Sequence, residues 1–224
     1  MRSSSSLPSA SKTAMRWEKA RSRSRQGILE AAGHVFIDDG FEKATMKRIA
    51  EVCGVTKATV YAHFRDKVRL YNAVMDRYLA SMPEATFDPG AEVELAGALT
   101  CIAQGIRTLA SHPACQAFCR TLTRSELDKG TYLERWNAIL QPYAQAAVCA
   151  LANVSRSQIN SEDGEKFLRL ILAEEGLPQG TEPVSSSDAT IALFLRSYGS
   201  EFARSSTASI TAPILRQPTE TPAA

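Results

Sequence analysis

Residues 45–67, TMKRIAEVCGVTKATVYAHFRDK, set the organisation of the whole chain. This stretch predicts two short helices joined by a tight turn. Ile49 and Ala50 fall on one face of the first helix, and the hydroxyl of Thr56 is placed to cap the start of the second. Gly54 lies between them, where so short a turn needs one residue at positive φ. A small residue, a glycine four positions on and an aliphatic residue six further on give the spacing of a helix-turn-helix.

A second motif follows the second helix at once, as a Y-x-H-F-x-x-K run. Its residues are Tyr61, His63, Phe64 and Lys67. With this run in place, the chain resembles the tetracycline-repressor (TetR) family of transcription regulators. The resemblance covers roughly residues 25–79, which begin with an apolar-striped helix that we expect to end at Gly40, its C-cap glycine.

The resemblance implies an all-α fold, with a three-helix DNA-binding head followed by a helical domain for effector binding and dimerisation. It implies a sequence-specific transcription regulator, in the first instance a dimeric repressor that a small-molecule ligand releases from a palindromic operator. The alternative on the same fold is a ligand-independent architectural or co-regulatory DNA-binding protein. An enzyme or a cofactor is not expected, because the chain has three histidines and lacks G-x-S-x-G, H-E-x-x-H and phosphate-cradling glycine motifs.

The family's DNA contacts carry over to matching positions of this head. They are Thr45, Lys47, Lys57, Ala58, Thr59, Tyr61, His63 and Lys67. By resemblance, residues 57–59 begin the recognition helix and lie nearest the base edges, where a lysine can donate to guanine. Tyr61, His63 and Lys67 are expected to donate to backbone phosphates, and Thr45 to add a contact at its own helix N-terminus.

Three positions depart from the family pattern, and at one of them Ala62 replaces a larger residue that is often found there. Met46 stands where a second threonine is common, and Ala58 where glycine is frequent, so we expect one phosphate contact fewer and an altered approach of the backbone to DNA. Two of the assignments have plain alternatives. His63 can instead be a buried core histidine, and Lys47 part of a solvated face.

Charge divides the chain in two. Residues 1–82 hold 15 Lys+Arg against 8 Asp+Glu, whereas residues 83–224 hold 11 against 16, so the basic half is the one expected to meet phosphate. No apolar run approaches the ~20 residues that span a bilayer, and the N-terminus has no apolar segment typical of a secretion signal. These features predict a cytoplasmic protein without a membrane partner.

Composition predicts four segments. We expect a flexible Ser-rich basic arm over residues 1–20, a DNA-binding head over 21–82 with its helix-turn-helix at 45–64, a helical domain over 83–204 and a disordered tail over 205–224. The bases of the arm can touch phosphate or enter a minor groove. The alternative is a solvated tail, with the start of translation at Met15.

The helical domain is expected to hold the effector and the dimer interface. The candidate pocket residues are Arg107, Phe118, Arg120, Trp136 and Tyr143. They can equally be core and surface residues. Pro142 falls inside a long helix, where a kink can open a cavity or be tolerated strain. The resemblance implies a homodimer through residues 164–175 and 187–204, and the alternative is that both stripes are intramolecular core.

The five cysteines are Cys53, Cys101, Cys115, Cys119 and Cys149. Their number is odd and they form no C-x-x-C pair, so reduced thiols and no metal site are expected. Cys115 and Cys119 can share a helix face, but two thiols without further ligands make a poor zinc site.

Overall fold

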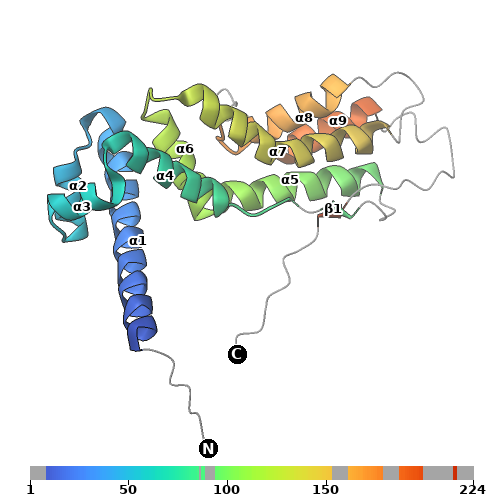
Figure 1. Cartoon of the computed structure of the whole chain (residues 1–224). Helices are drawn as coiled ribbons and strands as arrows, with labels where there is room; N and C mark the ends of the chain where they lie inside the picture. The colour runs from blue at the N-terminus through green and yellow to red at the C-terminus, as the bar shows by residue number, and fades with distance from the viewer. Residues whose placement is uncertain are drawn as a thin grey trace, which may run out of the picture. The chain divides into compact units, whose positions relative to one another are not determined.

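The computed structural model describes residues 9–85, 87–88, 94–152, 161–178, 187–198 and 214–215. The chain divides into two compact units, whose elements are coloured along the sequence in Figure 1. Unit 1 comprises Met1–Ala80 with Arg120–Leu127, and unit 2 comprises Ser81–Cys119 with Asp128–Ala224. The sequence predicted a boundary near residue 83. It did not predict that a later segment returns to the first unit.

The described part of unit 1 contains four helices and the end of a fifth. They are α1 (Ser9–Lys43), α2 (Met46–Cys53), α3 (Lys57–Phe64) and α4 (Lys67–Ala80). The apolar stripe predicted along the first helix is confirmed, because Ile28, Ala32 and Phe36 are fully buried. The ring of Phe36 meets Tyr71 of α4 edge-on, with 5.2 Å between centroids. Helices α1 and α4 thus form the core that carries the two short helices.

Helix α1 begins at Ser9, so the predicted flexible arm over residues 1–20 is wrong for its described part. The side chains of residues 13–26 are nearly all exposed, so tertiary packing does not hold this stretch in a helix. Local propensity does, because the stretch is rich in strong helix formers and continues a packed helix that has already nucleated. These residues are Ala14, Met15, Glu18, Lys19 and Ala20.

Gly40 interrupts the helical backbone of α1, so the long first helix ends there as predicted and a separate short helical segment follows to Lys43. Its backbone angles, φ 75° and ψ 165°, lie in a region that is essentially restricted to glycine. A Cβ at this position would lie 2.9 Å from the carbonyl oxygen of Arg124. Gly40 is therefore required twice, for its backbone conformation and for the close approach of the returning segment.

Unit 2 is also helical in its described residues, apart from one short strand pair. Its helices are α5 (Leu95–Ser111), α6 (Pro113–Thr123, which ends in unit 1), α7 (Lys129–Ala152), α8 (Ser161–Glu174) and α9 (Ser187–Tyr198). The strands β1 (Phe87–Asp88) and β2 (Ile214–Leu215) pair antiparallel. The predicted all-α architecture is therefore confirmed, whereas the strand at residues 214–215 corrects part of the predicted disordered tail. The rest of 205–224 lies outside the described residues.

Helices α7 and α8 approach each other closely at a glycine. A Cβ at Gly164 would lie only 2.7 Å from the backbone nitrogen of Val148, so α8 can rest on α7 there only without a side chain. Helix α7 runs on through Pro142, which lies at the surface. Among the described helices, none combines the length and apolar character that a membrane crossing requires.

Candidate nucleic-acid interface

Local capping fixes the turn between α2 and α3. The hydroxyl of Thr45 accepts from the amide of Arg48 at 3.1 Å, and that of Thr56 accepts from the amide of Thr59 at 3.2 Å. Gly54 closes α2 in the left-handed region, with φ 71° and ψ 26°. The predicted cap at Thr56 and the positive φ at Gly54 are confirmed.

A small core beneath the turn holds the two helices in place. Ile49 and Val60 are fully buried, and Ala50 and Phe64 nearly so. Met46 is also buried, so this side chain serves packing at the position where the family often has a threonine. The opposite sides of α2 and α3 are left for solvent or a ligand.

Several of the predicted DNA-contacting side chains share that outer side. The exposed ones are Thr45, Lys47, Lys57, Ala58 and Tyr61. The ammonium group of Lys57 lies over the ring of Tyr61, 5.6 Å from its centroid. The hydroxyl of half-buried Thr59 forms a 2.8 Å hydrogen bond with that of Thr56. Lys47 pairs with Glu51 at 3.8 Å with both side chains exposed, a contact that contributes little.

His63 is half-buried at the edge of this surface, so the alternative of a core histidine does not hold. Burial lowers the pKa of its imidazole, and the positive charges of Arg21 and Arg25 lower this pKa further. The guanidinium group of Arg25 also lies over the ring of Phe64, 4.3 Å from the centroid. Helix α1 therefore brings two arginines to the end of α3. Both arginines lie just beyond the arm that the sequence predicted over residues 1–20.

Lys67 was predicted to donate a hydrogen bond to a DNA phosphate, but in the structure it bonds to the protein itself. Its ammonium group donates to the carbonyl oxygens of Phe41 at 2.7 Å, Glu42 at 3.3 Å and Ala44 at 3.1 Å. A lysine ammonium has three hydrogens, so these bonds occupy all of its donors. The same group lies 4.4 Å from the centroid of the Phe41 ring. Lys67 joins the start of α4 to the end of α1, and its donors are used within the protein.

None of the five predicted pocket residues lines the groove between α7 and α8 or the hollow between α8 and α9. Phe118 and Trp136 are fully buried and stacked, with 5.8 Å between centroids, and Tyr143 is buried as well. Arg107 pairs with Glu175 at 3.4 Å, whereas Arg120 is exposed and belongs to unit 1. The aromatic residues are core. The indole nitrogen of Trp136 is a buried donor without a hydrogen-bond partner.

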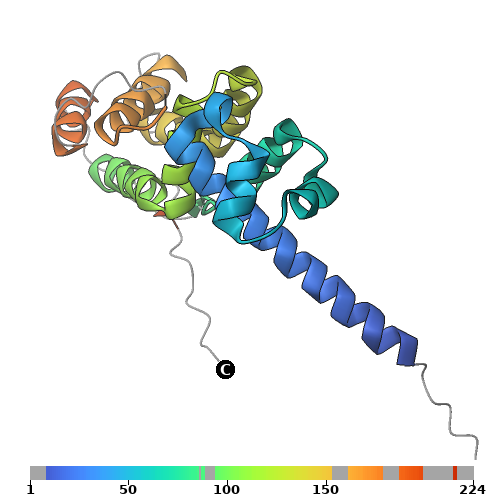
Figure 2. The same ribbon diagram turned by 90° about the vertical axis from the view of Figure 1, so that its left-hand side faces the viewer.

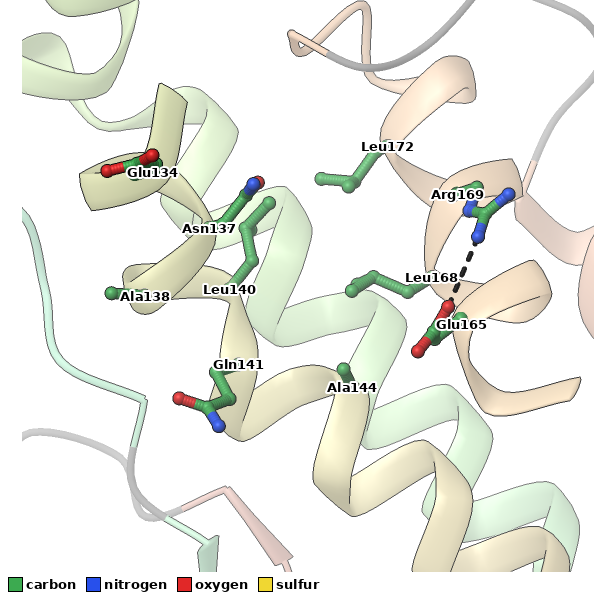
Figure 3. Close-up of a pocket in the computed structure, with 10 residues that line it drawn as sticks. All are labelled: Glu134, Asn137, Ala138, Leu140, Gln141, Ala144, Glu165, Leu168, Arg169 and Leu172. Atoms are coloured by element: carbon green, nitrogen blue, oxygen red, sulfur yellow. Dashed lines mark hydrogen bonds and ion pairs between the residues drawn. The ribbon is translucent and has the colours of Figure 1, made fainter. Parts of the chain in front are cut away.

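A groove of about 500 Å³ lies between α7 and α8 instead. Its lining is Glu134, Asn137, Ala138, Leu140, Gln141, Ala144, Glu165, Leu168, Arg169 and Leu172. Figure 3 shows Leu168 and Leu172 reaching from α8 toward α7, with the Arg169–Glu165 ion pair at 3.1 Å beside them. Pro142 has no amide hydrogen, so the carbonyl of Ala138 lacks its usual helical donor at this groove. The periodicity of the sequence did not predict this groove, because its lining comes from two separate helices.

All five cysteines are free thiols. Cys115 and Cys119 lie one turn apart on α6 and share a hydrogen bond, which lowers the pKa of Cys115 and raises that of Cys119. Within the described residues, no group of three or more His, Cys, Asp or Glu side chains is arranged to hold a metal ion.

Comparison with known proteins centres on the head. Residues 28–74 match the family model described as bacterial regulatory proteins, tetR family. The HTH-type transcriptional activator FasR of Mycolicibacterium smegmatis is 40% identical over 62 residues, which are 28% of this chain and 28% of FasR. The HTH-type transcriptional repressor AcnR of Corynebacterium efficiens is 37% identical over 67 residues, 30% of this chain and 36% of AcnR. The chain thus spans about a third of the length of these curated relatives.

Solved structures resemble a larger part of the chain. MexZ, titled a key repressor responsible for antibiotic resistance in Pseudomonas aeruginosa, has a TM-score of 0.57 and 20% identity, covering 85% of this chain and 99% of MexZ. A TetR transcriptional regulator from Agrobacterium tumefaciens has a TM-score of 0.58 and 19% identity, covering 81% and 99%. At such identities the likeness establishes the fold.

Proposed function

The chain belongs to the TetR family of bacterial regulatory proteins, and from that premise we propose that it is a sequence-specific DNA-binding transcription regulator. The observation that carries the proposal is the capped α2–turn–α3 unit, whose buried side fixes its position. Its outer side presents Lys57, Ala58 and Tyr61 where a recognition helix meets base edges and phosphates. The named relatives and structures are regulators, activators or repressors, which favours this class over an enzyme.

The surface of unit 2 supports a homodimer through α8 and α9. Leu170 and Leu193 are 41% and 51% exposed, and both line a hollow of about 440 Å³ between these helices. Large apolar side chains gathered around one hollow fit a protein partner better than water. A dimer also supplies the second recognition helix that a palindromic site requires, about one helical turn (~34 Å) from the first.

The dimer has a direct test. Leu193→Asp places a charge on the proposed interface and should convert the protein to monomers, measured by light scattering during gel filtration. Thr108→Asp adds the same charge on the exposed side of α5 and should leave the dimer intact. Dimers that persist in Leu193→Asp would place the interface elsewhere.

We place the effector site in the groove between α7 and α8. Its volume of about 500 Å³ and its mixture of leucines with a few polar groups suit a small organic molecule. Ala138→Trp would fill the groove, and Ala152→Trp puts the same side chain on an exposed part of α7 away from it. In a thermal-shift screen of metabolites, a ligand that stabilises the wild type and Ala152→Trp but not Ala138→Trp would support this site.

Effector binding would reach the head through the chain itself. Helix α6 begins in unit 2 and ends in unit 1, where Arg124 follows it and donates to the carbonyl oxygens of Ile37 at 2.9 Å and Asp38 at 2.8 Å. Helix α7, which lines the groove, begins at Lys129 directly after this segment, so a ligand that binds one position of α7 better than another would bias these contacts at the end of α1. The head is similar to the heads of an activator and of a repressor alike, and we propose a repressor that its ligand releases from the operator.

The proposed function is tested by selecting sequences from a pool of random duplexes with the purified protein. We expect a two-fold symmetric sequence that binds at least ~10³-fold more tightly than its scrambled version at physiological salt. Equal affinity for the selected and scrambled duplexes would overturn sequence-specific regulation. A metabolite that weakens binding to the selected duplex would separate an effector-controlled regulator from a ligand-independent DNA-binding protein.

A further inference from the structure

Trp17 lies on the side of α1 that faces the other helices of unit 1. Val35 follows it by about five full turns, so the two side chains leave the helix in the same direction, and Ile28 leaves it within about 20° of that direction. Val35 and Ile28 are buried in the core of unit 1. Trp17 is 73% exposed, because at its level α1 has already passed beyond that core.

Two arginines separate Trp17 from the end of α3. Arg21 and Arg25 follow it by about one and two turns, so the three side chains fall within about 80° of one another around α1. The guanidinium group of Arg25 lies 4.3 Å from the centroid of the Phe64 ring, and the charges of both arginines act on His63. Figures 1 and 2 both show α1 continuing past α2 and α3 toward its N-terminus. This side of α1 therefore continues the candidate DNA-contacting surface from His63 to Trp17.

The composition of this side of α1 suits a nucleic acid. An aromatic ring in line with arginines combines an apolar contact with attraction to phosphate. A lipid surface suits it less well, because the exposed Met15 points about 160° away from Trp17 around the helix. The two side chains make no single apolar face of the kind that a membrane-surface helix needs.

The shape of a duplex limits what this part of α1 can reach. A helix with its side chains is about 10–12 Å across and the minor groove is only about 6 Å wide, so a side chain can enter that groove but a helix cannot. Trp17 lies about 12 Å further along the helix axis than Arg25, a distance comparable with the width of the major groove. With α3 in the major groove, Trp17 would thus lie beyond its edge, where the minor groove adjoins.

We propose that Trp17 enters the minor groove beside the base pairs read by α3 and favours A·T pairs there. The indole nitrogen carries one N–H and accepts no hydrogen bond. The minor groove of an A·T pair presents only acceptors, whereas guanine adds an amino group that is a donor. This inference rests on the proposed function, because the ring reaches the groove only when α3 docks on DNA. Trp17 is then a specificity-determining residue outside the helix-turn-helix.

The first test compares Trp17→Ala with Met15→Ala in the full-length protein. Both variants remove a large exposed side chain from the same helix, and alanine has the highest helix propensity, so circular dichroism should show α1 intact. The probes are versions of the selected duplex in which the pairs that adjoin each half-site, on both sides, are A·T, G·C or I·C. An inosine–cytosine pair keeps the major-groove groups of G·C but lacks the minor-groove amino group.

The three duplexes should separate the two variants. The wild type and Met15→Ala should bind the A·T and I·C duplexes about fivefold more tightly than the G·C duplex, which corresponds to about one hydrogen bond. Trp17→Ala should bind all three about equally. A preference that persists in Trp17→Ala, or wild-type binding to I·C as weak as to G·C, would overturn the inference.

Fluorescence locates the ring directly, since the chain has two tryptophans and Trp136 is fully buried. Acrylamide should quench Trp17 strongly in the free protein and weakly in the complex with the A·T duplex. Quenching that DNA leaves unchanged would overturn the inference. So would shielding of Trp17 in the free protein that grows with protein concentration, which would assign the ring to a contact with a second copy of the chain. Failure of the proposed function looks different, because the wild type would then select no sequence.

Discussion

The ammonium group of Lys67 lies 2.7 Å from the carbonyl oxygen of Phe41, and it also bonds two further carbonyls at the end of α1. The last carbonyls of a helix lack intrahelical donors and carry partial negative charge, so a cation placed there both satisfies and neutralises them. The first residue of α4 thereby fixes the end of the longest helix of unit 1. The position that resembles a phosphate contact of the family is occupied by an internal bond.

Removing this contact should lower stability more than DNA affinity. Lys67→Met keeps the side-chain length and should lower the free energy of unfolding by about 2 kcal/mol, because bonds to a charged donor are lost and carbonyls are left unpaired. Urea unfolding measures this change. Lys47→Met, at an exposed lysine of α2, should change it by less than about 0.5 kcal/mol. An unchanged stability together with a smaller salt slope in Lys67→Met would restore the phosphate role.

Lys57 is expected to change sequence preference rather than overall affinity. Its side chain leaves the first turn of α3, where a basic residue can bond guanine, and one such contact discriminates by about 1–3 kcal/mol. Lys57→Ala should therefore weaken binding to the selected duplex and leave random duplex nearly unaffected. Lys47→Ala serves as the comparison and should weaken both about equally. Equal losses for Lys57→Ala would count against base reading.

Gly40 should tolerate no side chain. Gly40→Ala combines a strained backbone region with a Cβ 2.9 Å from the Arg124 carbonyl oxygen. The variant should lose about 1–3 kcal/mol of unfolding free energy, which is measured as a lower melting temperature. Gly130→Ala is the matched control, since a Cβ there meets nothing within 4 Å and alanine favours the helix α7 that contains it. Similar melting temperatures for the two variants would refute the double requirement at Gly40.

DNA binding should become tighter as the pH falls, through His63. Burial, Arg21 and Arg25 lower the pKa of this imidazole from its usual 6.5. The folded free protein thus binds fewer protons than the unfolded chain, and its free energy of unfolding decreases as the pH falls below that value. A phosphate beside the ring acts in the opposite direction by raising the pKa, so the complex takes up a proton.

The comparison is between two histidines. Affinity of the wild type for the selected duplex should rise from about pH 8 to about pH 6, and His63→Gln should remove the part of this rise that proton uptake causes. His34→Gln changes an exposed histidine on α1 and should leave the pH profile unaltered. Parallel profiles for the wild type and His63→Gln would mean that the ring meets no phosphate.

Features encoded within a few residues were predictable from the sequence. The caps at Thr56 and Gly54 and the buried pair Ile49 and Val60 depend on neighbours close in the chain, so spacing alone indicated the helix-turn-helix. Lys67 shows the limit of this approach. Its partners precede it by more than twenty residues, and nothing in its own motif points to the end of α1.

Two other predictions differ from the structure because side-chain packing or local helix propensity outweighs the sequence pattern that suggested them. Serine-rich composition suggested a flexible arm, but the helix formers between the serines extend α1 to Ser9. The aromatic residues Phe118 and Trp136 were candidate pocket residues, yet they bury each other's rings. The groove that does exist depends on how α7 and α8 diverge, which no periodicity within either helix specifies.

The return of Arg120–Leu127 to unit 1 means that the head is not a transferable cassette. A fragment that ends at Ala80 would expose the carbonyls of Ile37 and Asp38 that Arg124 now bonds. It would also remove Ser125, whose hydroxyl offsets part of the rise that burial causes in the pKa of Tyr71. A chimera that joins this head to another regulator's effector domain would need a matching segment at the end of its α6. Recombination between relatives at residue 80 is thereby restricted to partners whose later sequence already fits.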